Sequence, residues 1–327
     1  MKIRFLIKFL VTTFVCLMLL EWFCREFRPW YPSIEDSFDG FVVYNKDVGY
    51  KMANNFRGLY QQDYEMLYTT NSQGIRDREF SNYPEPDITR ILAIGDSWTF
   101  GPGVELKDTW PKQLETLLNE TGKKFEVINT GVSGYSTQNY LRTLKKFNNI
   151  YHPTTVIVMT TVNDPAGDLV GSSHKNSFLT SDDSMVKLFL KRHSHLAKQL
   201  WFLYQKSFSK TNPHVKVIEL NQRLGETKNT AVQKAFKLYN NALIEMRDYC
   251  RENNIQLYLT VNLAGSAFEE KTKRLAKEEE ITYISLSGTK GIKKLHGTNS
   301  AGHYNEQGYQ KIAKTLNSFL LNENLDE

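Results

Sequence analysis

Short apolar runs alternate with amphipathic segments along most of the chain from Arg90 onward. Five runs are apolar at nearly every position, which is typical of strands buried on both faces; they cover residues 90–95, 125–131, 154–160, 255–261 and 281–286. Other segments carry apolar residues at helical spacing and predict helices over residues 109–120, 136–149, 231–253, 268–279 and 305–322. This alternation predicts an α/β fold, with a five-stranded parallel sheet covered by helices on both faces.

Two parts of the chain depart from this pattern. Residues 38–77 contain short alternating or aromatic-rich runs separated by glycine and asparagine, which predict a small β-rich extension. Residues from about 165 to 224 fit no strand and helix repeat, and we interpret them as a largely helical insertion. We therefore predict an anchor over 1–24, a linker with the β-rich extension over 25–87, and an α/β domain over 88–327.

The N-terminus is strongly apolar. The run from Phe9 to Leu20 is short for a membrane span of about 20 residues, but the segment from Phe5 to Phe23 reaches that length if its flanking charged side chains extend to the interface. No small-residue cleavage motif follows, so we favour an uncleaved single-pass anchor over a cleaved signal peptide, with a buried soluble helix as a third alternative. Three basic residues, Lys2, Arg4 and Lys8, precede the run and favour a cytoplasmic N-terminus. The bulk of the protein is then expected outside the cytoplasm.

The amino-acid composition excludes few classes of function. With 327 residues, 40% hydrophobic and 24% charged, the chain is typical of a globular protein. Its net charge of +5 is spread along the sequence without a dense basic stripe, which argues against nucleic-acid binding. The three cysteines show no metal-ligand spacing, and we predict neither a metal nor another cofactor. The oligomeric state stays open.

Candidate chemistry lies where the predicted strands end. Ligands of open α/β sheets bind beyond the carboxyl ends of the strands. Ser97, Gly131 and Asn163 follow the first, second and third strands, and His303 stands just before the last helix. A serine nucleophile with a histidine base, and an oxyanion held by the amides of Ser97 and Gly131 and by the Asn163 side chain, can perform acyl transfer. Each residue alone also fits a turn or a helix cap.

Four sequence blocks resemble those of the SGNH (GDSL-type) hydrolase family. They are GDSWTFGPGV, VINTGVSGYST, TVND and GHYNEQGYQKIA, within a match from about residue 90 to residue 320. The resemblance implies a three-layer α/β/α sandwich with flavodoxin-like strand order, Ser97 as nucleophile, Gly131 and Asn163 as oxyanion donors, and His303 as base. The stretch TTNSQGIRDREF is also similar to membrane-anchored bacterial members with a small N-terminal extension.

The chain departs from the family pattern at two places. Thr161 stands where the third block usually begins with glycine, which an ordinary backbone φ would allow. The family acid normally precedes the histidine by two or three residues, where this chain has Ala301 and Ser300. Three alternatives follow. A backbone carbonyl near Ser300 orients His303, which then forms a Ser–His dyad, or Asp164 or Asp168 orients it. In the third alternative, activity is low or lost.

These patterns lead to one main hypothesis and two alternatives. The main one is a membrane-anchored, metal-independent serine esterase that removes O-acyl groups, above all O-acetyl, from a cell-envelope or exported polysaccharide. The enzymatic alternative is a lipid or lysophospholipid acylhydrolase, or an O-acyltransferase. The non-enzymatic alternative is a catalytically inactive domain that binds a glycan or a protein.

Overall fold

A computed structural model of the chain describes residues 2–27, 41–45, 48–60, 66–170, 194, 196–197, 200, 220, 223, 225–226, 228–286 and 302–323. Its centre is a five-stranded parallel sheet in the order β6-β5-β7-β8-β9. The strands are β5(Ile88–Gly95), β6(Lys124–Asn129), β7(Thr155–Thr160), β8(Gln256–Val261) and β9(Thr282–Tyr283). The predicted α/β fold and its flavodoxin-like order are confirmed, although the last strand is shorter than the predicted run over 281–286.

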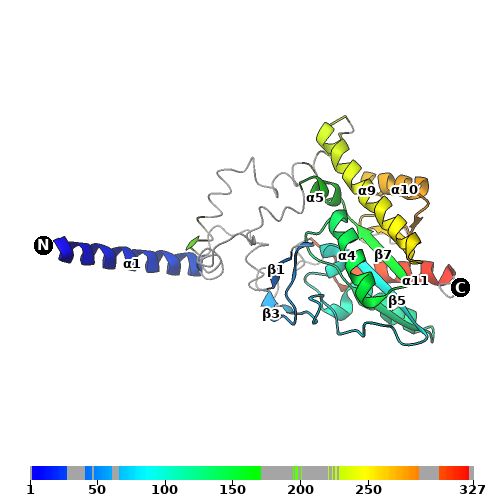
Figure 1. The fold of residues 1–327 in the computed structure, drawn as a ribbon, viewed down its shortest axis with the longest axis horizontal. Helices are drawn as coiled ribbons and strands as arrows, with labels where there is room; N and C mark the ends of the chain where they lie inside the picture. The colour runs from blue at the N-terminus through cyan, green and yellow to red at the C-terminus, as the bar shows by residue number, and fades with distance from the viewer. Residues whose placement is uncertain are drawn as a thin grey trace.

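Helices cover both faces of the sheet (Figure 1). One face carries α3(Trp110–Asn119) and α11(Glu306–Asn322), and the other carries α4(Thr137–Tyr151), α9(Thr230–Glu252) and α10(Ala267–Glu278). Side chains of a strand point alternately to the two faces. In β5, Leu92 and Ile94 therefore join the core under α4, α9 and α10, whereas Ile91 and Ala93 join the core under α3 and α11. Both faces are buried, which explains why the strand runs are mostly apolar instead of alternating between apolar and polar residues.

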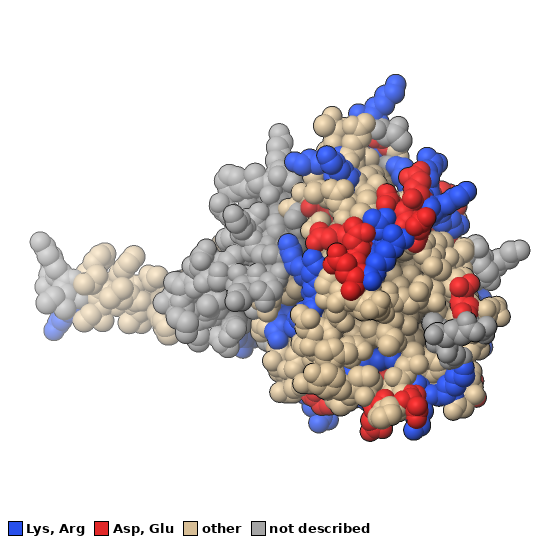
Figure 2. All heavy atoms as spheres, turned by 45° about the vertical axis from the view of Figure 1, so that its right-hand side comes forward, with Lys and Arg blue, Asp and Glu red and all other residues tan. Residues whose placement is uncertain are grey.

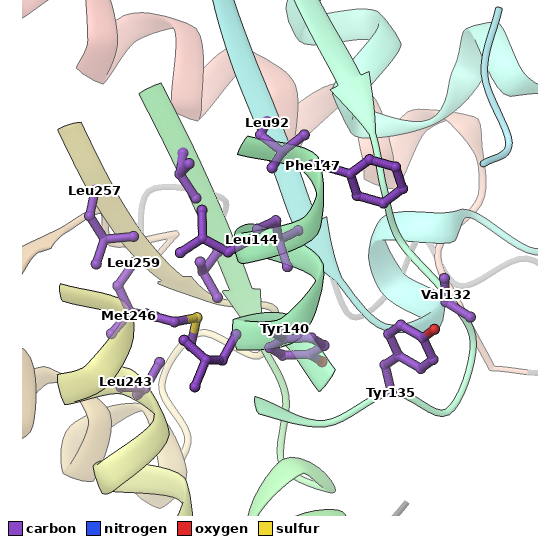
Figure 3. Close-up of a cluster of buried hydrophobic side chains, with 14 of the residues drawn as sticks. Leu92, Val132, Tyr135, Tyr140, Leu144, Phe147, Leu243, Met246, Leu257 and Leu259 are labelled. Atoms are coloured by element: carbon purple, nitrogen blue, oxygen red, sulfur yellow. The ribbon is translucent and has the colours of Figure 1, made fainter. Parts of the chain in front are cut away.

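The larger core lies under α4 and α9 (Figure 3). In α4, Tyr140, Leu144 and Phe147 recur at intervals of three or four residues and face the sheet. Leu243 and Met246 of α9 contact the same core, together with Leu257 and Leu259 of β8. The helical periodicity seen in the sequence is thus the face that each helix buries.

The β-rich extension consists of two antiparallel hairpins. They are formed by β1(Val42–Asn45) with β2(Gly49–Met52) and by β3(Arg57–Tyr60) with β4(Met66–Thr69). The extension does not stand apart from the α/β domain, since its side chains are buried in the same core cluster as β5 and α4. These side chains are Phe41, Val48, Met52, Tyr68 and Ile75.

The N-terminal segment forms one long helix, α1(Lys2–Phe27). Its stretch Arg4–Glu26 is long and apolar enough to cross a membrane, a test that a signal sequence also passes. Large apolar side chains along it are exposed, including Phe5, Phe9 and Phe14. Such a surface is unfavourable in water and suits a lipid environment.

The predicted helical insertion begins as a helix, α5(Asp164–Val170). Most of its remaining residues up to 224 lie outside the described part of the chain. Elsewhere the surface carries both signs of charge, and Figure 2 shows acidic and basic side chains intermixed on the face that it draws. Ion pairs join Lys145 to Glu245 and Arg251 to Glu280 across neighbouring segments. Exposed pairs of this kind contribute little to stability.

Candidate active site

Ser97 stands just after the carboxyl end of β5, an inner strand that pairs with β6 and β7. The chain turns after Gly95 directly into the single-turn helix α2(Ser97–Phe100), and Asp96 caps it, with Oδ1 accepting a hydrogen bond from the Trp98 amide at 2.9 Å. A side chain at position 95 would crowd this turn, because an added Cβ would lie 2.2 Å from Thr99 Oγ1 and 3.0 Å from the Met159 carbonyl oxygen. The capped turn therefore fixes Ser97 at the edge where ligands of such sheets bind.

His303 meets Ser97 across the fold. Its Nε2 lies 2.7 Å from Ser97 Oγ, although the two residues are 206 positions apart in the chain. The ring lies against the indole of Trp98, with centroids 4.7 Å apart. The hydroxyl of the next residue, Tyr304, donates to the Asn262 carbonyl at 2.8 Å. This bond holds the residues before α11 at the end of β8. The Ser97 and His303 side chains are thus within the distance that proton transfer needs.

Gly131 lies against the backbone of α2. A Cβ at this position would come within 2.3 Å of the Phe100 amide nitrogen and 2.6 Å of the Thr99 carbonyl carbon. The Gly131 amide donates to Asn129 Oδ1 at 3.1 Å, and the next amide, of Val132, donates to the Gly95 carbonyl at 3.2 Å. The loop after β6 is therefore held beside the serine turn, with the Gly131 amide already bonded to Asn129.

Asn163 is half-buried in the turn that follows β7. Its side chain lies close enough to the Asp96 carboxyl to lower the pKa of that group. Thr161, the departure from the family glycine, is not among the described non-glycine residues with positive φ. The condition under which threonine can replace the family glycine is therefore met, and an ordinary residue fits there without backbone strain.

The carboxylates considered as partners of His303 bond elsewhere. Asp164 accepts from the Tyr140 hydroxyl and from the Thr161 amide, each at 2.9 Å. Asp168 accepts from the Thr137 hydroxyl and, at 3.0 Å, from the Gln138 amide at the start of α4. These hydrogen bonds give no support to either aspartate as the group that orients His303. Ser300, the third candidate, lies outside the described residues.

Asp96 is a buried carboxyl next to the serine. Burial raises its pKa to about 7, against the opposing effects of the Trp98 amide and the Asn163 side chain. Among the described residues, its Oδ2 has no hydrogen-bond partner of normal geometry. Burial also raises the pKa of Asp164, and the Asp96 charge raises it further. Burial thus disfavours the charged form of both carboxyl groups.

Replacing Asp96 with asparagine is expected to flatten the pH dependence of stability. Because the folded pKa is about 7 and an unfolded aspartate titrates near about 4, the folded state holds more protons between these values. The free energy of unfolding therefore falls as pH rises through this window, and it should fall less in the variant. Denaturant unfolding across the window measures the difference, with the exposed Asp248→Asn as the control. An equally steep fall in Asp96→Asn and wild type would contradict the assignment.

Within the described ranges, no group of three or more His, Cys, Asp or Glu side chains is arranged to hold a metal ion. Ser97 and His303, predicted from the sequence as nucleophile and base, lie in contact, whereas the side chains that pack around them were not predicted. Trp98 was visible as a neighbour of Ser97, yet no periodicity or spacing indicates that its ring packs on His303.

An α/β/α sandwich with a serine and a histidine in contact at the carboxyl edge of its sheet is typical of a class of hydrolases. Residues 93–311, about two thirds of the chain, match the family model of the GDSL-like lipase/acylhydrolase family. The chain belongs to this family and is a hydrolase of ester bonds.

Comparison with solved structures found several similar hydrolases. The crystal structure of TesA is 15% identical, with 71% of this chain and 98% of that chain covered and a TM-score of 0.44. The lipase/acylhydrolase from Enterococcus faecalis is 13% identical, covering 72% and 96%, with a TM-score of 0.43. A mutant of Axe2, an acetyl-xylooligosaccharide esterase from Geobacillus, is 12% identical, covering 73% and 95%, with a TM-score of 0.41. At these scores the likenesses carry no argument about substrate. No curated protein matched the sequence.

Proposed function

We propose that this protein is a serine esterase that removes O-acyl groups, above all O-acetyl, from a cell-envelope or exported polysaccharide. The observation that carries the proposal is the 2.7 Å contact between His303 Nε2 and Ser97 Oγ at the carboxyl edge of the sheet. In the first step His303 takes the proton of Ser97 while Oγ attacks the ester carbonyl, and the sugar alcohol leaves with that proton. Water then attacks the acyl-serine with His303 again as base, which releases the carboxylic acid and restores the serine.

Three donors would hold the oxyanion of each step. The Ser97 amide belongs to the first residue of α2, so it has no acceptor within the helix. The Asn163 side chain lies near Asp96 at the same edge. The Gly131 amide now bonds to Asn129 Oδ1, and it would share or exchange that acceptor when substrate binds.

The proposed location follows from α1. We propose that this helix is an uncleaved single-pass anchor, with the basic residues Lys2, Arg4 and Lys8 on the cytoplasmic side and the hydrolase domain outside. An enzyme held there meets acylated envelope glycans, which is why we favour them as substrates. The same location brings the site near lipid esters, so a lysophospholipid is the second candidate, and transfer to another hydroxyl is the variant reaction.

The choice between these substrates can be tested with the detergent-solubilised full-length protein. We expect kcat/KM on an acetylated oligosaccharide to exceed that on a lysophospholipid by about tenfold or more, because recognition of sugar hydroxyls is lost on a lipid. Acetate release measures hydrolysis, and acetylation of an added unacetylated oligosaccharide measures transfer. A preference for the lysophospholipid would overturn the glycan assignment while leaving the esterase intact.

A further inference from the structure

The buried guanidinium of Arg76 lies at the C-terminal end of α2, the helix that begins with Ser97. Arg76 lies in the segment between β4 and β5, and only 2% of it is exposed. Nη1 donates to the carbonyls of Phe100 at 2.9 Å and Gly101 at 2.6 Å, and Nη2 donates to the Val104 carbonyl at 2.6 Å. One side chain of the extension therefore bonds to three carbonyls in the last residue of α2 and the loop behind it.

The charge of Arg76 is not paired with a carboxylate, since the ion pairs of the described residues do not include it. Its guanidinium carbon lies 4.5 Å from the centre of the Tyr68 ring and 5.0 Å from that of Phe100. Burial lowers the pKa of Arg76 to about 10, so the group still carries its charge at neutral pH. Burying such a charge is costly, and here the carbonyl oxygens and ring faces offset the cost.

The helix α2 is not stable without contacts to the rest of the protein. α2 has four residues, fewer than an isolated helix needs to be stable. Its start is capped by Asp96, and at its end the Gly101 amide donates to the Ser97 carbonyl at 2.9 Å. Within one turn, any displacement of Gly101 is passed directly to Ser97. The position of Ser97 relative to His303 therefore depends on what fixes the end of α2.

Other residues of the extension hold the same surroundings. The Tyr68 hydroxyl accepts from the Gly103 amide at 3.0 Å, in the loop that Arg76 also contacts. On the Gly131 side, Asp77 Oδ2 accepts from the Asn129 amide at 2.9 Å and the Tyr50 hydroxyl donates to the Ser133 carbonyl at 2.8 Å. The extension thus bonds to both loops that flank the serine.

We propose that Arg76 is a positioning residue of the active site, which holds α2 and the loop 101–104 so that Ser97 stays within reach of His303. The inference rests on the proposed serine-esterase function. It makes the β-rich extension part of the catalytic unit, although the predicted domain division places it in front of residue 88.

Arg76→Met tests this proposal against Arg90→Met as the matched control. Arg90 is also buried, at 1% exposure, and bonds to Glu126 and to the Tyr151 carbonyl, but it lies at the opposite edge of the sheet. We expect Arg76→Met to lower kcat on a small activated acetate ester by about 10- to 100-fold with KM nearly unchanged, because misplacement by about 1 Å costs that much. Arg90→Met should lose similar thermal stability and keep kcat within about threefold. Arg76→Lys, which presents a point charge in place of the planar fork, should recover only part of the loss.

Two further measurements keep the test decisive. Tyr68→Phe retains the ring and removes the hydroxyl that accepts from the Gly103 amide, so it should fold and lose kcat by a smaller factor. Hydrogen exchange of the amides 97–104 should become faster in Arg76→Met and stay unchanged in Arg90→Met. Unchanged exchange there, or a loss of kcat no greater than in the control, would overturn the positioning role. A wild-type protein without ester hydrolysis would instead overturn the proposed function, while the exchange data would still decide about Arg76.

Discussion

Replacing Ser97 with alanine is expected to lower kcat for ester hydrolysis by about 10³-fold or more, because no acyl-enzyme can then form. His303→Ala should have an effect of the same order, since the serine loses the base that lies 2.7 Å from its oxygen. The double variant should be no worse than either single one, because the two residues act as a unit. Initial rates on a small activated acetate ester measure all three.

A fluorophosphonate probe makes the same test without turnover. The wild type should carry the adduct on Ser97, identified by mass spectrometry, and His303→Ala should label far more slowly. Ser318→Ala is the matched control, because Ser318 is an exposed serine of α11 whose hydroxyl bonds only within its own helix, to the Lys314 carbonyl at 2.9 Å. Labelling that persists in Ser97→Ala would assign the nucleophile elsewhere. A wild type that neither labels nor hydrolyses would leave the glycan- or protein-binding alternative.

The sheet could be predicted from the sequence because burial on both faces leaves a clear mark. Residues 91–94 are all apolar, and their side chains alternate between the two hydrophobic cores on the two faces of the sheet. The last strand was predicted too long for a related reason. Ile284 and Leu286 are buried like strand residues, yet the ladder with β8 ends at Tyr283. An apolar run indicates that its side chains are buried, but it does not show where the backbone pairing with the neighbouring strand ends.

The site was only partly predictable. Ser97, Gly131 and Asn163 follow three adjacent strands, so parallel strand order alone gathers them at one edge. Arg76 left no such signal, because its three carbonyl partners are 24 to 28 residues ahead in the chain and are backbone atoms, which any sequence supplies. The hydrogen bond between Tyr140 and Asp164 could not be predicted for a different reason, since it depends on where α4 packs.

Gly131→Ala is expected to be the most damaging change outside the Ser97–His303 pair. The added methyl would lie 2.3 Å from the Phe100 nitrogen and 2.6 Å from the Thr99 carbonyl carbon, and both are backbone atoms that no rotamer change can move. Either α2 or the loop after β6 must shift. Overpacking of this kind lowers the free energy of unfolding by about 1–3 kcal/mol. A shift of Ser97 or of an oxyanion amide by about 1 Å should lower kcat by about 10²-fold or more.

Gly225→Ala is the matched control for this change, because an added Cβ at position 225 meets no described atom within 4 Å and its φ is not positive. Its kcat and unfolding free energy should stay close to those of the wild type. Urea unfolding and steady-state kinetics on the same preparations separate the two consequences of Gly131→Ala. If stability falls and kcat does not, the glycine serves only the packing of two loops. If the unfolding free energy and kcat both fall while KM stays unchanged, the close approach of the Gly131 backbone to α2 keeps Ser97 and the loop after β6 in the relative positions that catalysis needs.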